Sequence, residues 1–297
     1  MKKLYRKRFY PGNFNWKNFY VKVFIPFLAL SLLSGCTING TGSTKTEQST
    51  KEKYIVTENT HILKSVEKNI LGDEAKEKVV LYAEQDKNGM PIAWSVVVDD
   101  VEKIKLPVKE EGLYSFADLK FEDVDGDHKN EVLVYRQSSG SAGAMGLAIY
   151  KPQEGAGAWQ LLFAIEDPFD YASGSETGQE NNARFEVKYA GDYYVVFKDH
   201  QTGLKSTIPL AKEEYKGSES LLQTISTWID PIIDYSLVDH DGNGVKEIIT
   251  LQRVIGISHV DTLALLKTTY QLKGGYYQAV SLTLYDNKDK PLAEVKL

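Results

Sequence analysis

Short apolar segments rich in β-branched and aromatic residues, separated by turn-forming clusters, recur along the chain from about Tyr54 to its end. Such segments, four to six residues long, are typical of β-strands. Residues 86–89 (DKNG) and 274–275 (GG) lie between apolar segments, as hairpin turns do. The pattern predicts a mainly β fold, with strands over residues 79–82, 93–98, 131–135, 147–150, 193–197 and 248–251.

One segment departs from this pattern. Five apolar residues recur there at the three- and four-residue spacing of a helix face: Leu221, Leu222, Ile225, Trp228 and Ile229. Ser218 stands where an N-cap belongs, and Pro231 follows the last apolar residue, as it often does after a helix. We therefore expect one short helix of about three turns near residues 218–229.

The N-terminal 35 residues have the composition of a bacterial secretion signal. The first 22 contain seven Lys and Arg and no acidic residue, and an 11-residue, mostly apolar run follows over residues 23–33. A helix needs about 20 apolar residues to cross a membrane, and Pro26 interrupts this run, so it does not predict a permanent span. We interpret residues 1–35 as a signal peptide.

Residues 33–36, Leu-Ser-Gly-Cys, resemble the lipobox of bacterial lipoproteins, in which the cysteine receives a diacylglycerol and becomes the new N-terminus. Cys36 is the only cysteine of the chain. The resemblance implies a lipoprotein anchored in a membrane through acyl chains on Cys36, each buried CH₂ contributing roughly 0.8 kcal/mol. The features favour the outer face of a Gram-positive cell membrane; in a Gram-negative cell, Thr37 after the cysteine would indicate the outer membrane.

The anchor is followed by a tether and one extracytoplasmic domain. Residues 36–53 hold the lipidated cysteine and a polar segment with too little apolar surface to fold, and residues 54–297 form the β-rich domain. Without residues 1–35, 28 Lys and Arg stand against 41 Asp and Glu, a net charge of about −13. This charge argues against nucleic acid as a partner.

A repeated acidic pattern is the strongest organisational signal. D-x-D-G-[DN]-x-x-x-E, followed at once by an apolar run, occurs over residues 123–131 and 239–247, and a degenerate copy covers residues 69–77. The three copies start 54 and 116 residues apart, so a fourth, eroded copy near residues 180–187 would complete a period of about 55–58 residues. The spacing predicts a domain of about four repeated β units.

The residue types in these loops suit a hard cation. Ca²⁺ takes six to eight oxygens at about 2.3–2.6 Å, which a coiled loop supplies from carboxylates at positions 1, 3 and 5 and a backbone carbonyl at position 7. These are not EF-hands, because the acidic residue that follows stands at position 9 and not at 12. The expected ligands are Asp123, Asp125, Asp127, Lys129 and Glu131 in the first acidic loop, and Asp239, Asp241, Asn243, Val245 and Glu247 in the second.

The two acidic loops resemble the Ca²⁺ loops of the FG-GAP/VCBS repeat group, known from the β-propeller of integrin α-chains and from bacterial surface proteins. The resemblance covers about 12 residues at each of two places, without a clear Phe-Gly…Gly-Ala-Pro segment. It implies a propeller-like arrangement with metal in a mainly structural role. The length suits about four units or a two-lobed β domain better than a seven-bladed ring.

Other motifs are weaker. The glycine-rich stretch over residues 140–146 lacks the G-K-[ST] of a P-loop, and the five histidines are too scattered for a zinc pair. We expect no catalytic residue. Three functions stay open: a Ca²⁺-stabilised module that binds a cell-envelope polysaccharide or a protein, an envelope-polymer hydrolase, or an accessory lipoprotein subunit of a surface complex. The acidic loops also have a simpler interpretation as exposed turns, since Asp, Asn and Gly favour turns for backbone reasons alone.

Overall fold

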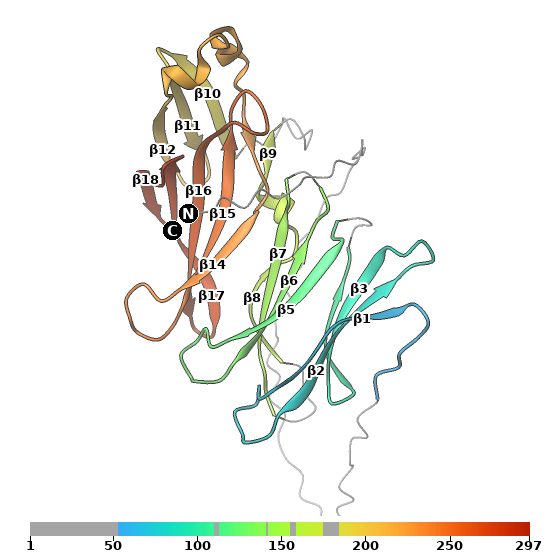
Figure 1. Cartoon of the computed structure of the whole chain (residues 1–297). Coiled ribbons are helices and arrows are strands. Elements are labelled where there is room, and N and C mark those ends of the chain that lie inside the picture. Colours follow the sequence, from blue (N-terminus) through green and yellow to red (C-terminus); the bar gives the residue numbers. More distant parts are fainter. Residues whose placement is uncertain (1–52, 110–112, 141, 155–158, 175–183) are drawn as a thin grey trace, which may run out of the picture.

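The computed structural model describes residues 53–109, 113–140, 142–154, 159–174 and 184–297 (Figure 1). These residues form four antiparallel sheets, which confirms the prediction of a mainly β fold. Cys36, the predicted signal peptide and almost all of the predicted tether lie outside the described residues. No helix within the described ranges is long and apolar enough to cross a membrane.

The first two sheets are meanders in which each strand pairs with the next. The first sheet contains β1 (Thr60–Lys68), β2 (Glu77–Gln85), β3 (Pro91–Val98) and β4 (Val101–Pro107). The second sheet contains β5 (Phe116–Glu122), β6 (Glu131–Gln137), β7 (Met145–Lys151) and β8 (Gln160–Ile165). A 3₁₀-helix, η1 (Pro168–Tyr171), follows the second sheet.

The third sheet is small and the fourth is large. The third contains β10 (Phe185–Gly191), β11 (Tyr194–Asp199) and β12 (Lys205–Pro209). The fourth contains β9 (Ser173–Gly174), β13 (Trp228–Ile229), β14 (Asp234–Val238), β15 (Glu247–Ile255), β16 (Thr262–Lys273), β17 (Tyr276–Asp286) and β18 (Pro291–Lys296). Its order is β18-β17-β16-β15-β13-β9, and β14 also pairs with β15.

The strands predicted from the sequence lie where the apolar runs placed them, in β2, β3, β6, β7, β11 and β15. Only Tyr193, at the start of one predicted segment, stands in the turn before β11. Residues 86–89 join β2 to β3 and residues 274–275 join β16 to β17, so both hairpin turns are confirmed.

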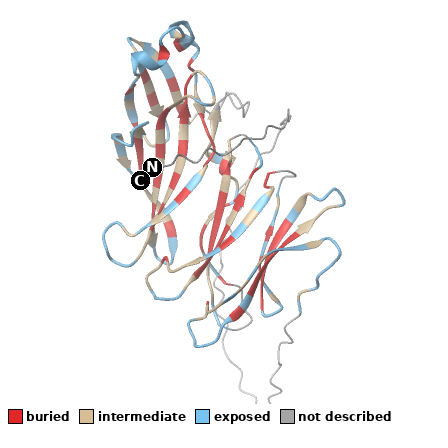
Figure 2. Ribbon diagram, viewed as in Figure 1, coloured by how far each residue is buried: buried red, intermediate tan, exposed pale blue. Residues whose placement is uncertain are grey.

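Three apolar layers hold the sheets together, and buried residues run as stripes along the strands (Figure 2). Alternate residues of β6 face opposite ways: Val132 and Val134 pack toward the first sheet, and Leu133 packs toward the fourth. A third layer joins the third sheet to the fourth, and Phe197 of β11 and Leu266 of β16 both belong to it. The second sheet is therefore covered on both faces.

The long strands of the fourth sheet carry two of these layers on one face. Ile248 belongs to the layer shared with the second sheet, and Val254, six residues later on β15, belongs to the layer shared with the third. Residues an even number apart on a strand point to the same side. One face of the fourth sheet thus covers the second sheet at one end and the third sheet at the other.

The short helix predicted near residues 218–229 is confirmed only over its first half, and its predicted length of three turns is wrong. Glu219–Thr224 form a short 3₁₀-helix, η4, after another, η3 (Lys212–Tyr215), and the Ser218 side chain makes no capping hydrogen bond. Trp228 and Ile229 instead form β13, which pairs with β9 and β15. The apolar spacing arose because Leu222, Ile225 and Ile229 are all buried against the third and fourth sheets, and packing outweighed helical periodicity.

The eroded fourth loop expected near residues 180–187 is also wrong where the structure describes it. Residues 185–187 begin β10, and residues 180–183 lie outside the described ranges. The first two strands of the third sheet are joined by a tight turn at Asp192 and Tyr193, both with positive φ. The third sheet is a unit without an acidic loop.

Candidate metal centre

Three loops of the same length each join two paired strands that follow one another in the chain. They are residues 69–76 between β1 and β2, 123–130 between β5 and β6, and 239–246 between β14 and β15. These are the three segments that carry the acidic pattern, counting the degenerate copy. The repeat in sequence therefore corresponds to a repeat in structure.

The glutamate at position 9 is the first residue of the strand that follows the loop, and it turns its carboxylate back into the loop. Its Oε2 accepts a hydrogen bond from the backbone N–H of position 2, at 2.9 Å for Ile70 and Glu77, 2.9 Å for Val124 and Glu131, and 3.1 Å for His240 and Glu247. All three glutamates are buried. Because a backbone N–H that is turned away from water needs an acceptor, each carboxylate helps to fix the start of its loop.

Position 1 and the glycine at position 4 form a second shared contact. The side-chain oxygen of position 1 accepts a hydrogen bond from the glycine N–H, at 2.7 Å for Asn69 and Gly72, 2.8 Å for Asp123 and Gly126, and 2.8 Å for Asp239 and Gly242. The three glycines have φ of 79°, 79° and 73°, a conformation that a side chain resists. The coil of the loop thus depends on the glycine that the pattern contains.

The two acidic loops share three further hydrogen bonds. Oδ2 of position 1 accepts from the N–H of position 6, position 3 accepts from the N–H of position 5, and position 5 accepts from the N–H of position 7. Position 6 has positive φ in both loops, 67° at His128 and 88° at Gly244. The backbone therefore wraps around both sets of carboxylates in the same way.

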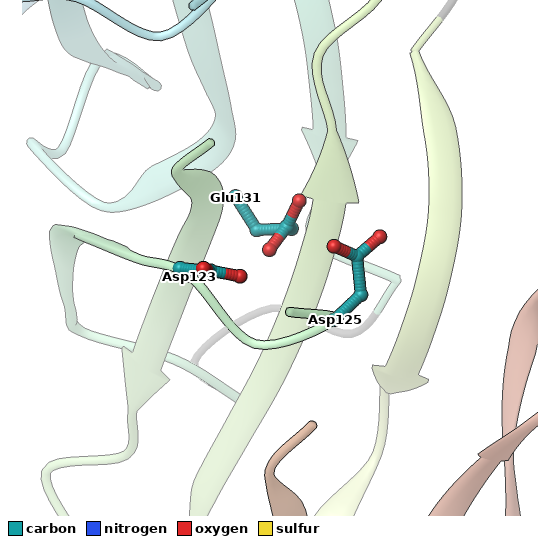
Figure 3. A group of neighbouring side chains, drawn as sticks. All are labelled: Asp123, Asp125 and Glu131. Carbon is teal, nitrogen blue, oxygen red and sulfur yellow. The ribbon is translucent and has the colours of Figure 1, made fainter. Parts of the chain in front are cut away.

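In the first acidic loop, three carboxylates converge. One oxygen from each of Asp123, Asp125 and Glu131 lies within 4.8 Å of the others, and Figure 3 shows the three groups pointing into one space. Glu131 is fully buried, and its Oε1 has no hydrogen-bond partner among the described residues. Burial raises the pKa of Glu131 to about 7. A cation near Oε1 would remove this desolvation penalty.

Lys151, at the end of β7, supplies a cation to this loop. Its Nζ forms ion pairs with Asp125 and with Asp127, the latter at 2.8 Å. Burial would lower the pKa of Lys151, but these two pairs raise it above its ordinary value. The ammonium does not bond Glu131 Oε1, so one buried oxygen of the cluster stays unsatisfied within the described part of the chain.

The second acidic loop satisfies its oxygens differently. Glu247 Oε1 accepts a hydrogen bond from Gln271 Nε2 on β16 at 3.3 Å. Asn243 Nδ2 donates to Asp241 Oδ2 at 3.0 Å. Among the described residues, the carboxylates of Asp239, Asp241 and Glu247 form no cluster like that of the first loop. The structure therefore brings together three of the five expected ligands in the first loop and no such group in the second.

Lys129 and Val245, expected to offer carbonyl oxygens, stand at position 7 and contact neighbouring loops through their side chains. A methyl group at Gly72 would overlap the aliphatic chain of Lys129, and one at Gly126 would lie 3.4 Å from Val245. The three loops are therefore stacked side by side, each touching the next. The carbonyl role of position 7 stays a prediction.

Tyr277, on β17, links the two acidic loops. Its hydroxyl lies 3.0 Å from the carbonyl oxygen of Val124 and 2.9 Å from that of Lys246, and its single proton is shared between them. The Lys246 N–H also donates to Val124 O at 2.9 Å. Since Val124 belongs to the first acidic loop and Lys246 to the second, the two acidic loops form one hydrogen-bonded unit.

Sequence reasoning missed Lys151, Gln271 and Tyr277. Each reaches the loops from a strand that lies outside the repeated nine-residue pattern, on β7, β16 and β17. No local spacing marks them, because their neighbours are set by how strands pair and sheets pack. The charge excess of the first acidic loop was the one available signal, since four carboxylates in nine residues repel one another in the absence of a cation.

The chain is similar in sequence to a family of domains and to a curated protein. Residues 183–285 match the model of the YybI C-terminal domain. The chain is similar to the uncharacterized protein YybI of Bacillus subtilis (strain 168), with 24% identity over 160 residues, 51% of this chain and 56% of that protein. The chain thus covers about half the length of this curated relative. No solved structure matches. The matched domain spans the third sheet and most of the fourth, including the second acidic loop.

Proposed function

We propose that this protein is an extracytoplasmic lipoprotein whose β domain is stabilised by Ca²⁺ and binds a cell-envelope polysaccharide or another protein. The anchor is supported by the basic start, the short apolar run and the lipobox-like residues that end at Cys36. The similar protein comes from Bacillus subtilis, which fits the outer face of a Gram-positive cell membrane. The mature charge of about −13 speaks against nucleic acid as the partner.

The observation that carries the metal assignment is the unsatisfied oxygen of Glu131. A fully buried carboxylate oxygen without a hydrogen-bond partner is costly, and two more carboxylates point at the same space. Ca²⁺ is the cation whose preferred ligands are these oxygens. Asp123, Asp125, Asp127, Glu131 and the carbonyl of Lys129 would hold it in the first loop.

The second loop would bind more weakly, because its oxygens already have partners. Asp239, Asp241, Asn243, Glu247 and the carbonyl of Val245 would hold the ion once Gln271 gives up Glu247. Both ions would order the fold and take no part in chemistry, as the resemblance to FG-GAP/VCBS loops implies. That resemblance supports a domain built from repeats, with a propeller-like or two-lobed arrangement.

Calorimetric titration of Ca²⁺ into the chelator-stripped full chain, purified in detergent, tests this proposal. We expect heat from two unequal sites and a rise in melting temperature, since an ion that binds only the folded state stabilises it. Glu131→Gln should abolish the tighter site. Glu77→Gln is the matched control, because Glu77 makes the same hydrogen bond to a loop N–H where Leu71 replaces the second carboxylate.

Two outcomes would contradict the metal assignment. Absence of both heat and thermal shift at millimolar Ca²⁺ would reduce the loops to acidic turns, and equal effects of Glu131→Gln and Glu77→Gln would show a purely structural carboxylate. Incubation with cell-envelope extract tests the interaction role. Bound glycan supports the module proposed here, a single stoichiometric protein indicates an accessory subunit, and release of reducing sugar indicates a hydrolase.

A further inference from the structure

Val124 ties together the three converging carboxylates of the first acidic loop, although its own side chain is apolar. It stands between Asp123 and Asp125 in the chain, and its backbone N–H donates to Oε2 of Glu131 at 2.9 Å. Its side chain is fully buried in the apolar layer between the second and fourth sheets. The position of Val124 therefore helps to set where all three carboxylates of the cluster lie.

The carbonyl oxygen of Val124 is held from the fourth sheet. The Tyr277 hydroxyl lies 3.0 Å from this oxygen, and the backbone N–H of Lys246 donates to it at 2.9 Å. A carbonyl oxygen has two lone pairs, so it can accept from both groups. Because a peptide unit is planar, the two donors also fix the plane that contains the N–H of Asp125. The fourth sheet thus orients the backbone from which Asp125 projects.

Tyr277 can hold this oxygen because its own position is fixed. The ring is buried in the same layer as Val124 and packs edge to face against Phe163 of β8, with ring centres 6.1 Å apart. Its hydroxyl also lies 2.9 Å from the carbonyl oxygen of Lys246. The hydroxyl is thus held between two carbonyl oxygens, one from each acidic loop, and a shift of either loop would lengthen one of the two contacts.

These contacts join two parts of the chain that are far apart in sequence. Tyr277 and Val124 are 153 residues apart. Both Tyr277 and Lys246 lie within residues 183–285, which match the YybI C-terminal domain, whereas the three converging carboxylates lie before that match. The candidate ion site in the earlier part of the chain is therefore built against the later part.

We propose that Tyr277 is a positioning residue of the first acidic loop, and that Ca²⁺ in this loop in turn strengthens the contact between the second and fourth sheets. The inference rests on the Ca²⁺ site proposed above for this loop, which is supported by the buried Oε1 of Glu131 without a hydrogen-bond partner among the described residues. It requires no ion in the second loop.

The physical basis of this coupling is that ion binding and the sheet contact place the same backbone segment. An ion that draws the carboxylates together holds Val124 where Tyr277 and Lys246 meet its carbonyl oxygen. Such coupling is reciprocal, because a contact that favours ion binding is favoured by the bound ion to the same extent.

Calorimetric titration of Ca²⁺ into the full chain in detergent compares the parent chain with Tyr277→Phe, which keeps the ring and removes only the hydroxyl. We expect the dissociation constant of the tighter site to rise about tenfold, as for groups that orient metal ligands, while the number of bound ions stays the same. Tyr285→Phe is the matched control. Because Tyr285 lies at the opposite end of β17, beside Lys267, this variant should bind Ca²⁺ like the parent chain.

Hydrogen exchange of the Lys246 backbone amide measures the reverse effect, from the ion to the sheet contact. This N–H donates to Val124 in the other loop, so Ca²⁺ should slow its exchange in the parent chain. The slowing should be absent in Glu131→Gln, which keeps an amide oxygen for the Val124 N–H, and smaller in Tyr277→Phe. An ion in the second loop alone would slow exchange equally in Glu131→Gln, so this variant separates the two loops.

Two results would overturn the inference while leaving the Ca²⁺ proposal intact. They are a parent-like affinity in Tyr277→Phe, and exchange of the Lys246 amide that Ca²⁺ leaves unchanged or slows equally in the parent chain and in Glu131→Gln. Absence of any Ca²⁺ binding by the parent chain would overturn both proposals. If Tyr277→Phe does not fold, the exchange comparison between the parent chain and Glu131→Gln decides, since it needs no change at Tyr277.

Discussion

Gly126 lies so close to Gly244 that a methyl group on its α-carbon would come within 3.0 Å of the Gly244 carbonyl oxygen. The two glycines belong to different acidic loops, on the second and fourth sheets. The contact leaves little space for a side chain at a position where the φ of 79° already disfavours one. The close stacking of the two acidic loops thus depends on a glycine at position 4 of the repeated pattern.

Gly126→Ala should destabilise the chain more than Gly242→Ala. Both glycines stand at position 4 with positive φ, but a methyl group at Gly242 would meet nothing within 4 Å. We expect a loss of about 1–2 kcal/mol for Gly242→Ala from backbone strain, and of about 2–4 kcal/mol for Gly126→Ala from strain and displacement together. Urea unfolding measures both, and equal losses would show that the loops do not press on each other.

Lys151→Met should lower the stability of the Ca²⁺-free chain and raise the affinity of the first acidic loop for Ca²⁺. Without the ion, the variant loses the cation that pairs with Asp125 and Asp127, so we expect a loss of about 1–2 kcal/mol from carboxylate repulsion. With the ion, affinity should rise about tenfold, since no ammonium has to be displaced; that factor corresponds to about 1.4 kcal/mol.

Lys246→Met is the matched control for Lys151→Met. Lys246 has the same side-chain exposure, 27%, but its Nζ pairs with Glu122, outside the loop carboxylates. The Lys246→Met variant should keep a Ca²⁺ affinity within about twofold of the parent value, because a partly exposed ion pair contributes little free energy. Weaker Ca²⁺ binding in Lys151→Met than in this control would mean that Lys151 and the ion do not compete.

The fold class and the repeated loops were predictable because both depend on local sequence. Runs such as residues 131–135 alternate between two buried faces and begin directly after a turn, which identifies a strand without reference to the rest of the chain. The Asp123-to-Glu131 spacing likewise forms one compact loop from nine consecutive residues. Local hydrogen bonds within that loop then set its conformation.

The features that were missed depend on distant parts of the chain. The apolar residues near Ile225 follow helical spacing, but Trp228 and Ile229 gain sheet partners that their own segment does not reveal. Arg136 ends an ordinary strand pattern, where an arginine normally reaches solvent, and it is buried only because the first sheet covers it. Lys151 meets the first loop through strand pairing, for which no spacing rule exists.

Acid should weaken the third sheet through Asp199. Burial would raise the pKa of this carboxyl, but hydrogen bonds from Arg184 and Thr202 outweigh it and hold the pKa below the ordinary 3.8. A carboxyl whose pKa is lower in the folded than in the unfolded chain stabilises the fold above pH 3.8, and this stabilisation is lost as pH falls through the folded pKa.

Asp199→Asn should therefore lower the free energy of unfolding by about 2–4 kcal/mol at pH 7. This loss is smaller than the loss expected for a fully buried ion pair, because the Arg184 side chain is 30% exposed. The difference from the parent chain should narrow as pH falls below about 4, which urea unfolding at several pH values would show. Glu186→Gln, which removes an exposed pair with Lys198 in the same sheet, should change stability little at any pH. If the difference in unfolding free energy between the parent chain and Asp199→Asn stays constant with pH, the charge of Asp199 does not stabilise the fold.

Phe163, on β8, joins the second sheet to the fourth through three tyrosines. Its ring packs edge to face against Tyr235, Tyr270 and Tyr277, with ring centres 6.3, 5.1 and 6.1 Å apart. Phe163→Ala should cost about 3–5 kcal/mol, because it removes these contacts and leaves a cavity. Phe116→Ala, at a 60% exposed position of the same sheet, should stay within about 0.5 kcal/mol of the parent chain. Similar unfolding free energies for the two variants would mean that this cluster does not hold the sheets together.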